Sequence, residues 1–292
     1  MAVAKANTAT STTLANVTAR KIDFASQFSN EFLALMGLLD VARPIKKESG
    51  TELRMVKVAV DLEESVAEGE IIPYSELEFD EVTADPITLE KYSKGVTAEA
   101  INNYGYETAV DKSDQELLAE ITGEITNNLY GALVTESAIT ATATGLQAQL
   151  AKAQGKVRSY FESIHKGITG TVAWVNTEDF YDYLGDAPLS VQTAFGMTYI
   201  QNFLGYDVIF VTSQVTSGEV WATALNNLNV YYIDPADSAF AQAGLVYVTD
   251  DTGFIGVQIK GNYETAVSET YAITGAKLYP EYADGIAVVS TP

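Results

Sequence analysis

The stretch DKSDQELLAEITGEITNNLYGALVTE, residues 111–136, predicts one long helix around which the rest of the chain is organised. Ser113 followed by Glu116 forms a capping-box pattern, while Asp111 and Asp114 place negative charge at the positive end of the helix dipole. At about 1.5 Å per residue the helix would be roughly 39 Å long, about the width of a small domain. Its apolar residues recur at spacings of three and four, which is the period of one helical face: Leu118, Ile121, Ile125, Leu129 and Ala132.

Two long stretches of alternating polar and apolar residues precede this helix, at residues 51–66 and 77–96. Between them, residues 67–76 read AEGEIIPYSE, in which glycine and proline favour a turn. The pattern predicts a β-hairpin with long strands and an acidic tip. Because an isolated two-stranded hairpin is only marginally stable in water, we expect this one to find its partners on another subunit.

The first 50 residues differ from the rest in composition and charge. Residues 1–20 are mostly Ala, Thr and Ser and predict a flexible or draped arm. From Phe24 onward the apolar residues take a helical spacing, which predicts a short amphipathic helix that ends before Pro44. This part of the chain is mildly basic, whereas nearly all of the remainder is acidic, so the arm is suited to lie on the acidic body of a neighbouring copy.

The remainder of the chain predicts a mixed α/β region and then strands that return to the long helix. Within residues 138–242 we expect a helix near 146–164 and a second helix capped by Asn176 or Thr177, together with strands at 171–175, 206–211, 219–224 and 228–233. The strands of the tail are predicted to pair with the chain on either side of the long helix, which would make the base domain discontinuous in sequence. They lie at 245–249, 256–260, 265–272 and 286–289.

Composition limits the classes of function. With 292 residues and 47% hydrophobic content, the chain can bury a large core. It contains no cysteine, no apolar run near the ~18 residues of a membrane span and no signal-peptide core, so we expect a soluble cytosolic product. A net charge of −22 argues against a surface that grips the phosphates of nucleic acid, because such surfaces need clustered Lys and Arg.

Patterns for catalysis and metal binding are sparse. His165 is the single histidine and is interpreted as a partly exposed residue at a helix end. Residues 251–253 read Asp-Thr-Gly, the core of the aspartic-protease motif, but one copy would need a dimer, and the four residues from Asp250 also form an ordinary turn pattern. Residues 234–237, DPAD, offer oxygen atoms without the spacing of a calcium loop. The sequence therefore predicts no catalytic residue, no cofactor and no metal.

Three segments in order carry a resemblance to a known family. They are SVAEGEIIP at 65–73, LEFDEV at 77–82 and LEKYSKGVT at 89–97, and together they resemble the major capsid proteins of tailed bacteriophages. The resemblance implies an α+β fold with an N-terminal arm, an extended loop formed by a long β-hairpin, a spine helix, a peripheral domain and an axial domain. On this chain those parts would be the arm at 1–50, the loop at 51–96, the peripheral domain at 97–137 and 243–292 with the spine helix at 111–136, and the axial domain at 138–242.

The same resemblance implies a function. The protein would be a structural, non-enzymatic subunit that self-assembles as hexamers and pentamers into an icosahedral or prolate head shell, enclosing double-stranded DNA without binding it specifically. Scaffolding, portal and decoration proteins would be further partners, no membrane would be involved, and assembly in the host cytoplasm would place the protein in the virion. The residues expected to contact another subunit are Glu68, Gly69, Glu70, Ile71, Ile72, Pro73, Tyr74, Arg20, Lys21, Phe24 and Phe28.

Two departures and three alternatives accompany this interpretation. Residues 102–106, NNYGY, replace the short acidic turn expected before the spine helix, and only about 50 residues precede the loop, too few for a fused scaffolding domain. Lys57 lies in the loop, but nothing identifies a cross-linking partner for it. An encapsulin-like nanocompartment shell shares the fold. From other classes, an acidic surface adhesin or binding module would require a secretion signal, and a hydrolase would use Asp251.

Overall fold

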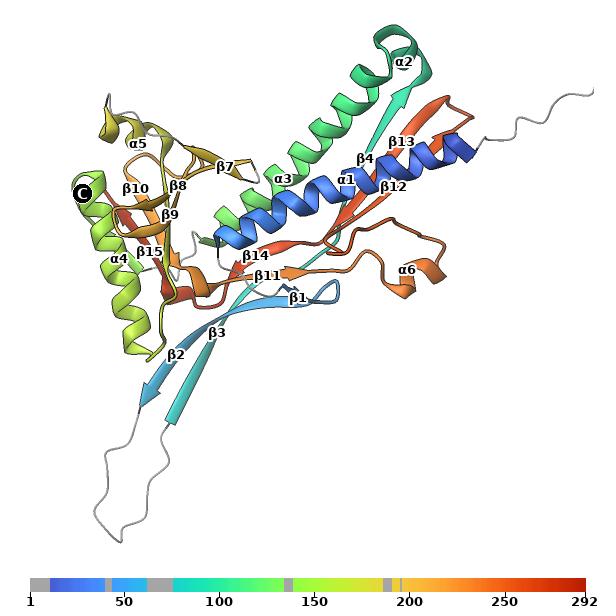
Figure 1. Ribbon diagram of the computed structural model, residues 1–292. Coiled ribbons are helices and arrows are strands. Elements are labelled where there is room, and N and C mark those ends of the chain that lie inside the picture. Colours follow the sequence, from blue (N-terminus) through green and yellow to red (C-terminus); the bar gives the residue numbers. More distant parts are fainter. Residues whose placement is uncertain (1–10, 40–43, 62–75, 134–138, 186–190, 195) are drawn as a thin grey trace, which may run out of the picture.

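The computed structural model describes residues 11–39, 44–61, 76–133, 139–185, 191–194 and 196–292. Two long helices and two three-stranded sheets lie at one end of the molecule, a seven-stranded sheet lies at the other, and a two-stranded hairpin extends away from both (Figure 1). Within these ranges no helix combines the length and the apolar character needed to cross a membrane.

The predicted long helix is confirmed as α3, Lys112–Leu133, and all the residues of its predicted apolar face are buried. Its start differs from the prediction, because the π-helix η1 (Glu107–Asp111) leads directly into α3 and Ser113 lies inside continuous helix. The Ser113 hydroxyl donates to the backbone carbonyls of Ala109 and Val110, at 2.7 and 2.9 Å. The capping-box prediction is therefore wrong.

A shorter helix, α2 (Ala98–Tyr104), stands before η1 and carries the residues that departed from the expected pattern. Its N-cap is Thr97, whose hydroxyl accepts from the N–H of Ala100 at 3.2 Å. Gly105 ends it with φ of 80°, a left-handed conformation that glycine adopts without steric cost, and the chain then turns into η1. At the other end of α3, the predicted residues 134–136 lie outside the described part of the chain.

An antiparallel sheet lies beside both long helices. Its strands, in the order β12-β13-β4, are β12 (Ile255–Asn262), β13 (Val267–Thr274) and β4 (Glu90–Thr97). Residues 90–97, which the alternation pattern assigned to the second arm of the hairpin, instead pair with β13 along the whole of β4. The alternation of apolar and polar residues indicates which side chains face a core, but it does not indicate which strand lies next to them. The predicted strand at 245–249 is reduced to a single bridge between Val248 and Val257.

The N-terminal helix is longer than predicted. α1 spans Ser11–Leu38, so residues 11–20 are helical where the sequence predicted a flexible or draped arm, while residues 1–10 lie outside the described part of the chain. The sequence holds no glycine or proline before Gly37, so no strong helix breaker interrupts this stretch. The apolar face of α1 packs against β12 and α3, and its predicted members are all buried: Phe24, Phe28, Phe32, Leu35, Met36 and Leu39.

A second three-stranded sheet lies beneath α3, and its strands come from three segments that are far apart in the sequence. β11 (Leu228–Tyr232) is its central strand, with β1 (Ile45–Lys46) parallel on one side and β14 (Lys277–Pro280) antiparallel on the other. β14 was not predicted, and β11 was placed in the mixed α/β region. α6 (Ser238–Gln242) follows β11 on the surface.

The mixed α/β region is a seven-stranded sheet in the order β5-β15-β10-β6-β9-β8-β7. α4 (Leu146–Ser163) covers one face of it, and α5 (Thr177–Leu184) begins at Asn176, the predicted cap, whose side chain accepts from the N–H of Glu178 at 2.8 Å. The strands are β5 (Ile139–Thr142), β6 (Thr171–Val175), β7 (Gln192–Ala194), β8 (Met197–Phe203), β9 (Tyr206–Val211), β10 (Glu219–Ala224) and β15 (Ile286–Ser290).

The C-terminal strand lies in a different place from the one predicted. β15 pairs with β10 and β5 inside the seven-stranded sheet and not with the strands beside α3. Two short 3-10 turns connect this sheet to the sheet of β1, β11 and β14. η2 (Leu225–Asn227) lies between β10 and β11, and η3 (Ala283–Gly285) lies between β14 and β15. Asn227 joins them, because its buried side chain accepts from the N–H of Tyr282 at 2.8 Å and donates to the carbonyl of the same residue at 3.0 Å.

Candidate assembly interface

The predicted hairpin is confirmed for the strands that the structure describes. β2 (Glu52–Asp61) and β3 (Glu76–Pro86) pair antiparallel, with an irregularity between Glu52 and Arg54. Ten residues of strand reach about 33 Å at ~3.3 Å per residue, and Figure 1 shows the hairpin projecting from the body. Within the described chain the two strands pair only with each other, so both outer edges present backbone N–H and C=O groups that another subunit can use.

The root of the hairpin is fixed to the body. Leu53 and Ile87 are 3% and 1% exposed and pack in one cluster with residues of β14 and β15. The N–H of Ile87 donates to the carbonyl of Thr51 at 2.9 Å, and the N–H of Gly50 donates to the carbonyl of Ile87 at 2.8 Å. The predicted contact residues at the tip, Glu68 to Tyr74, lie outside the described part of the chain.

The predicted contact residues of the N-terminal helix serve their own subunit. Phe24 and Phe28 are 5% and 0% exposed in the main core of their own subunit, so their rings leave little surface for a neighbour, and the expected contact with one stays a prediction. The Lys21 ammonium donates to the side-chain oxygen of Gln258 on β12 at 2.5 Å. Arg20 belongs to a polar network at the point where α1, α3, β4 and β13 come together.

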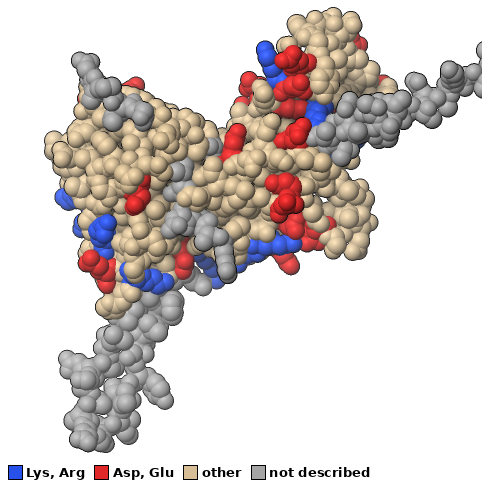
Figure 2. Space-filling model, in the orientation of Figure 1, with Lys and Arg blue, Asp and Glu red and all other residues tan. Residues whose placement is uncertain are grey.

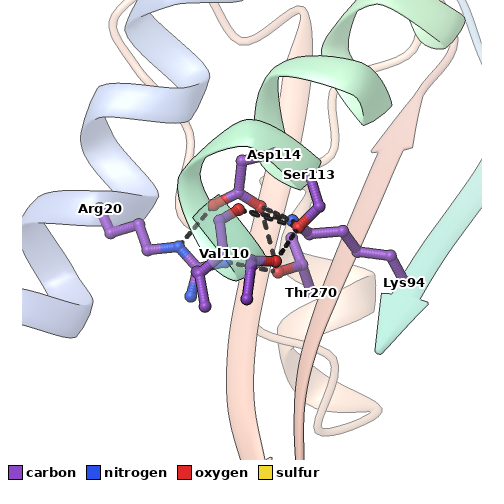
Figure 3. A network of polar contacts seen from close by, with 7 residues as sticks. Arg20, Lys94, Val110, Ser113, Asp114 and Thr270 are labelled. Carbon is purple, nitrogen blue, oxygen red and sulfur yellow. Dashed lines mark hydrogen bonds and ion pairs between the residues drawn. The ribbon is translucent and has the colours of Figure 1, made fainter. Parts of the chain in front are cut away.

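We call this cluster the Asp114 network; it consists of Arg20, Lys94, Ser113, Asp114 and Thr270 (Figure 3). One oxygen of the Asp114 carboxylate accepts from Arg20 Nε at 2.6 Å, and the other lies 2.7 Å from Lys94 Nζ. Arg20 Nη2 also donates to the Thr270 hydroxyl at 3.1 Å, and Lys94 donates to Ser113 Oγ at 2.5 Å. One carboxylate therefore ties two cations from different elements to the start of α3.

Burial sets the electrostatics of the network. The side chains of Arg20, Lys94 and Asp114 are only 12–14% exposed. Burial lowers the pKa of Lys94, and the nearby Arg20 acts in the same direction, whereas the hydrogen bond and charge of Asp114 raise it. Because both cations are committed to Asp114, the network holds elements together and offers no free acid or base for catalysis.

The residues considered for chemistry form turns. Asp250 accepts from the N–H groups of Thr252 and Gly253 at 3.1 and 3.3 Å, which confirms the turn interpretation of the Asp-Thr-Gly motif, and Asp251 is exposed. His165 is exposed at the end of α4 with φ of 56°, as interpreted from the sequence. Among the described residues, no group of His, Cys, Asp and Glu is arranged to hold a metal ion.

The candidate calcium loop is also a turn. Asp234 accepts from the N–H of Ala236 at 2.9 Å, and Asp237 caps α6. Lys46 Nζ lies 2.9 Å from Asp234 and 3.8 Å from Asp237, so one ammonium group is already paired with both carboxylates. The hydrogen bond to Lys46 lowers the pKa of Asp234 against the opposing effect of desolvation, which is the largest single influence.

Charges are unevenly distributed over the face in Figure 2. Lys and Arg gather along the lower edge, around β1 and α4, whereas Asp and Glu gather higher, around α1 and the beginning of α3. In the sheet of β1, β11 and β14, Lys47 Nζ lies 5.7 Å from the centre of the Tyr231 ring, and Lys277 is opposite Tyr231. Neither lysine forms an ion pair within the described chain. These charges lie near the root of the hairpin.

Comparison with known proteins gives a result at the level of structure. No family model and no curated protein matches the chain. The chain is similar to a subunit of the Cyanophage A-1(L) capsid, with TM-score 0.55 and 12% identity over 88% of this chain and 92% of that one. It is also similar to the virus-like particle of Pyrococcus furiosus, with TM-score 0.51 and 13% identity over 92% and 98%. A third similar structure is the capsid of an empty GTA particle, with TM-score 0.53 and 9% identity over 87% of this chain and 89% of that one.

This chain has the fold of a phage capsid subunit. The match covers 92% and 88% of this chain, so the similarity extends over nearly the whole chain and not over one segment alone. The α+β capsid fold that the resemblance of residues 65–97 implied is confirmed, whereas its division into arm, extended loop, spine helix, peripheral domain and axial domain stays a prediction. Sequence reasoning missed the Asp114 network, because Asp114 was assigned only to the helix dipole and Lys94 to the hairpin, and no local spacing marks either as a partner of Arg20.

Proposed function

We propose that this protein is the structural shell subunit of a tailed-bacteriophage head. It self-assembles through hexamers and pentamers into a closed icosahedral or prolate shell around double-stranded DNA, and it has no enzymatic activity. The observation that carries the proposal is the similarity of nearly the entire chain to the cyanophage capsid subunit. The location would be the virion, after assembly in the host cytoplasm.

The elements take the following roles in the proposal. The hairpin β2–β3 is the extended loop, α3 is the spine helix, the two three-stranded sheets with α1 form the peripheral domain, and the seven-stranded sheet forms the axial domain. In this proposal β4 and β11 are assigned to the peripheral domain and β15 to the axial domain, unlike the boundaries expected from the sequence; the support is that β4 pairs with β13, β11 with β1, and β15 with β10.

The hairpin is the proposed main contact between subunits. Its tip, residues 62–75, holds four glutamates and no basic residue. The ammonium groups of Lys47 and Lys277, which form no ion pair within the described chain, provide a complementary surface near the hairpin root of the next copy. The apolar tip residues Ile71, Ile72 and Tyr74 would each contribute about 1.5–3 kcal/mol if fully buried there.

The charge of the chain suits a DNA-filled shell. A net charge of −22 keeps the wall from binding phosphates tightly, so packaged DNA would be enclosed without specific contacts. Portal, decoration and separate scaffolding proteins are the further partners of such a shell. A subunit surface that bound duplex DNA tightly and released it with salt in a gel-shift assay would contradict this part of the proposal.

An encapsulin-like nanocompartment, which shares the fold, is the second candidate, since the chain is also similar to a protein that forms a virus-like particle, that of Pyrococcus furiosus. Electron microscopy and sedimentation of the purified protein test the shared claim, because a stable monomer under all assembly conditions, with or without a scaffolding protein, would refute both functions. Particles purified from the native source then separate the two. DNA inside the particles supports the phage head, whereas a protein cargo without DNA supports the nanocompartment.

A further inference from the structure

The outer face of α4 is basic in a chain that is acidic as a whole. Residues 146–166 contain four Lys and Arg residues against one acidic residue, Glu162, whereas the whole chain carries a net charge of −22. We call Lys152, Lys156 and Arg158 the α4 basic face. All three side chains are exposed, and none forms an ion pair within the described part of the chain. An acidic surface is therefore the complementary partner.

The sequence pattern of this helix recurs in α3 with the charges reversed. α4 reads LAKAQGKV at 150–157, and α3 reads LAEITGEI at 118–125. In each helix an alanine and a glycine lie four residues apart, and a charged residue follows each of them, lysine in α4 and glutamate in α3. Four helical residues rise about 6 Å at ~1.5 Å per residue, so the two pairs of charges have the same spacing along their helix axes.

α3 carries a matching acidic face on its outer side. The α3 acidic face consists of Glu116, Glu120 and Glu124, which are exposed and form no ion pair among the described residues. Hydrogen bonds to uncharged groups do not neutralise either face. Lys152 donates to the backbone carbonyl of Thr142 at 2.8 Å, and Glu124 accepts from the hydroxyl of Tyr92 at 2.5 Å. Both faces therefore keep their charge.

Small residues next to the charges allow another helix to come close. Ala119 of α3 and Ala151 of α4 are exposed. At Gly123 of α3 and Gly155 of α4, an added Cβ would find no atom of another element within 4 Å. Helix axes approach to about 8 Å where the side chains at the contact are small, which brings charged residues beside the contact within reach of each other.

The α3 and α4 helices of one chain do not meet. They lie on opposite faces of the seven-stranded sheet, because Val172 and Trp174 of β6 pack in the core cluster with α3, whereas Ala173 and Val175 pack in the cluster with α4. Figure 1 shows α4 at the outer edge of this sheet and α3 on its other side. The complementary face must therefore come from another molecule.

We propose that the α4 basic face packs on the α3 acidic face of a second copy of this chain. Each copy has one face of each kind, so the contact is heterologous and repeats from one copy to the next. Such a contact closes a ring when the rotation between copies allows it. The inference rests on the proposed shell function and deepens it, since hexamers and pentamers are rings of this kind.

Reversing the charges on both helices tests the proposal. Lys152→Glu/Lys156→Glu reverses α4, Glu120→Lys/Glu124→Lys reverses α3, and a fourfold variant carries all these substitutions. We expect each double variant to lower the yield of particles in sedimentation several-fold, because like charges then face each other. The fourfold variant should restore most of the yield, since the two faces are complementary again with their signs exchanged.

The control variant changes the charge elsewhere. Lys91→Glu/Ala241→Glu/Gln242→Glu lowers the net charge by the same amount as the α4 reversal, at exposed positions outside both faces, and should leave the particle yield unchanged. Circular dichroism of the unassembled subunits establishes that each variant is folded.

Cross-linking gives a second readout that does not depend on the charged variants, because the chain has no cysteine. Ala119→Cys and Ala151→Cys are co-expressed as single variants, and the assembled particles are treated with a short bis-maleimide. The matched control pairs Ala119→Cys with Ala241→Cys, an exposed alanine on α6. We expect the two-chain product to be several-fold more abundant with Ala151→Cys than with the control, and this comparison decides the question if a charge-reversed variant unfolds.

The failure of this inference is distinguishable from failure of the shell function. Normal particles from either double variant, a fourfold variant no better than the double variants, or equal cross-linking at both positions overturn the α3–α4 contact and leave the shell function standing. Normal particles that lose their DNA on α4 reversal assign the α4 basic face to nucleic acid and also overturn the contact. If the unmodified chain forms no particles, the shell function and this inference fail together.

Discussion

Replacing Asp114 by alanine should destabilise the subunit far more than replacing another acid of α3. The Asp114 carboxylate lies 2.6 Å from Arg20 Nε and 2.7 Å from Lys94 Nζ, and all three side chains are only 12–14% exposed. Alanine leaves two neighbouring cations without a counterion. Losing one partner of a buried pair costs about 3–5 kcal/mol, and residual water access reduces this to about 2–3 kcal/mol here. At ~2–4 °C per kcal/mol, Tm should fall by roughly 4–12 °C.

The assay is thermal unfolding of the unassembled subunit, followed by circular dichroism at one protein concentration, because assembly itself would raise Tm. Glu116→Ala is the matched control, since Glu116 is exposed on the same helix and forms no ion pair within the described chain. The double variant Asp114→Ala/Lys94→Met should lose less than the sum of the single variants, because it removes the uncompensated ammonium. Equal Tm values for Asp114→Ala and Glu116→Ala would refute the reasoning.

Three further predictions address the hairpin, the Asp-Thr-Gly motif and alkaline stability. Replacing residues 62–75 with a short Gly-Ser turn should leave Tm nearly unchanged, because Leu53 stays buried at the hairpin root. The same variant should form only small oligomers in sedimentation. An unfolded variant, or shells of normal size, would contradict this prediction. Asp251→Asn should leave particle yield and infectivity unchanged, and loss of infectivity from normal particles would reveal a chemical role. Burial raises the pKa of Tyr206 above its ordinary value of 10.0. As pH rises above that value, Tyr206 ionises first in the unfolded chain, and the folded state loses stability. Tyr206→Phe should therefore shift the midpoint of alkaline unfolding to higher pH in a pH titration.

Local patterns were enough to predict several elements from the sequence. The spacing of Leu118, Ile121 and Ile125 predicted the buried face of α3, and the strand at 171–175 agrees with β6. Alternation on both sides of AEGEIIPYSE predicted the hairpin strands, because side chains of a strand face opposite sides in turn. The resemblance to phage capsid proteins came from the same region, and it supplied the architecture that periodicity alone did not.

Sequence reasoning failed where position depends on partners far along the chain. β4 and β15 were recognised as extended, but their alternation could not show that one pairs with β13 and the other with β10. The helical start of α1 was missed because Ala, Thr and Ser are also common in arms, and packing on β12 and α3 supports the helix further along.

The candidate interface shows the same division. By itself the sequence determined the periodic faces, the excess of acid, the absence of cysteine and the acidic hairpin tip, because these are properties of composition and of neighbouring residues. Only the tertiary structure decided that Arg20 meets Asp114, 94 positions away, and Thr270, 250 positions away. Ion pairs and grooves need atoms within a few ångströms in space, and residue spacing along the chain encodes such proximity only within one helix or one strand.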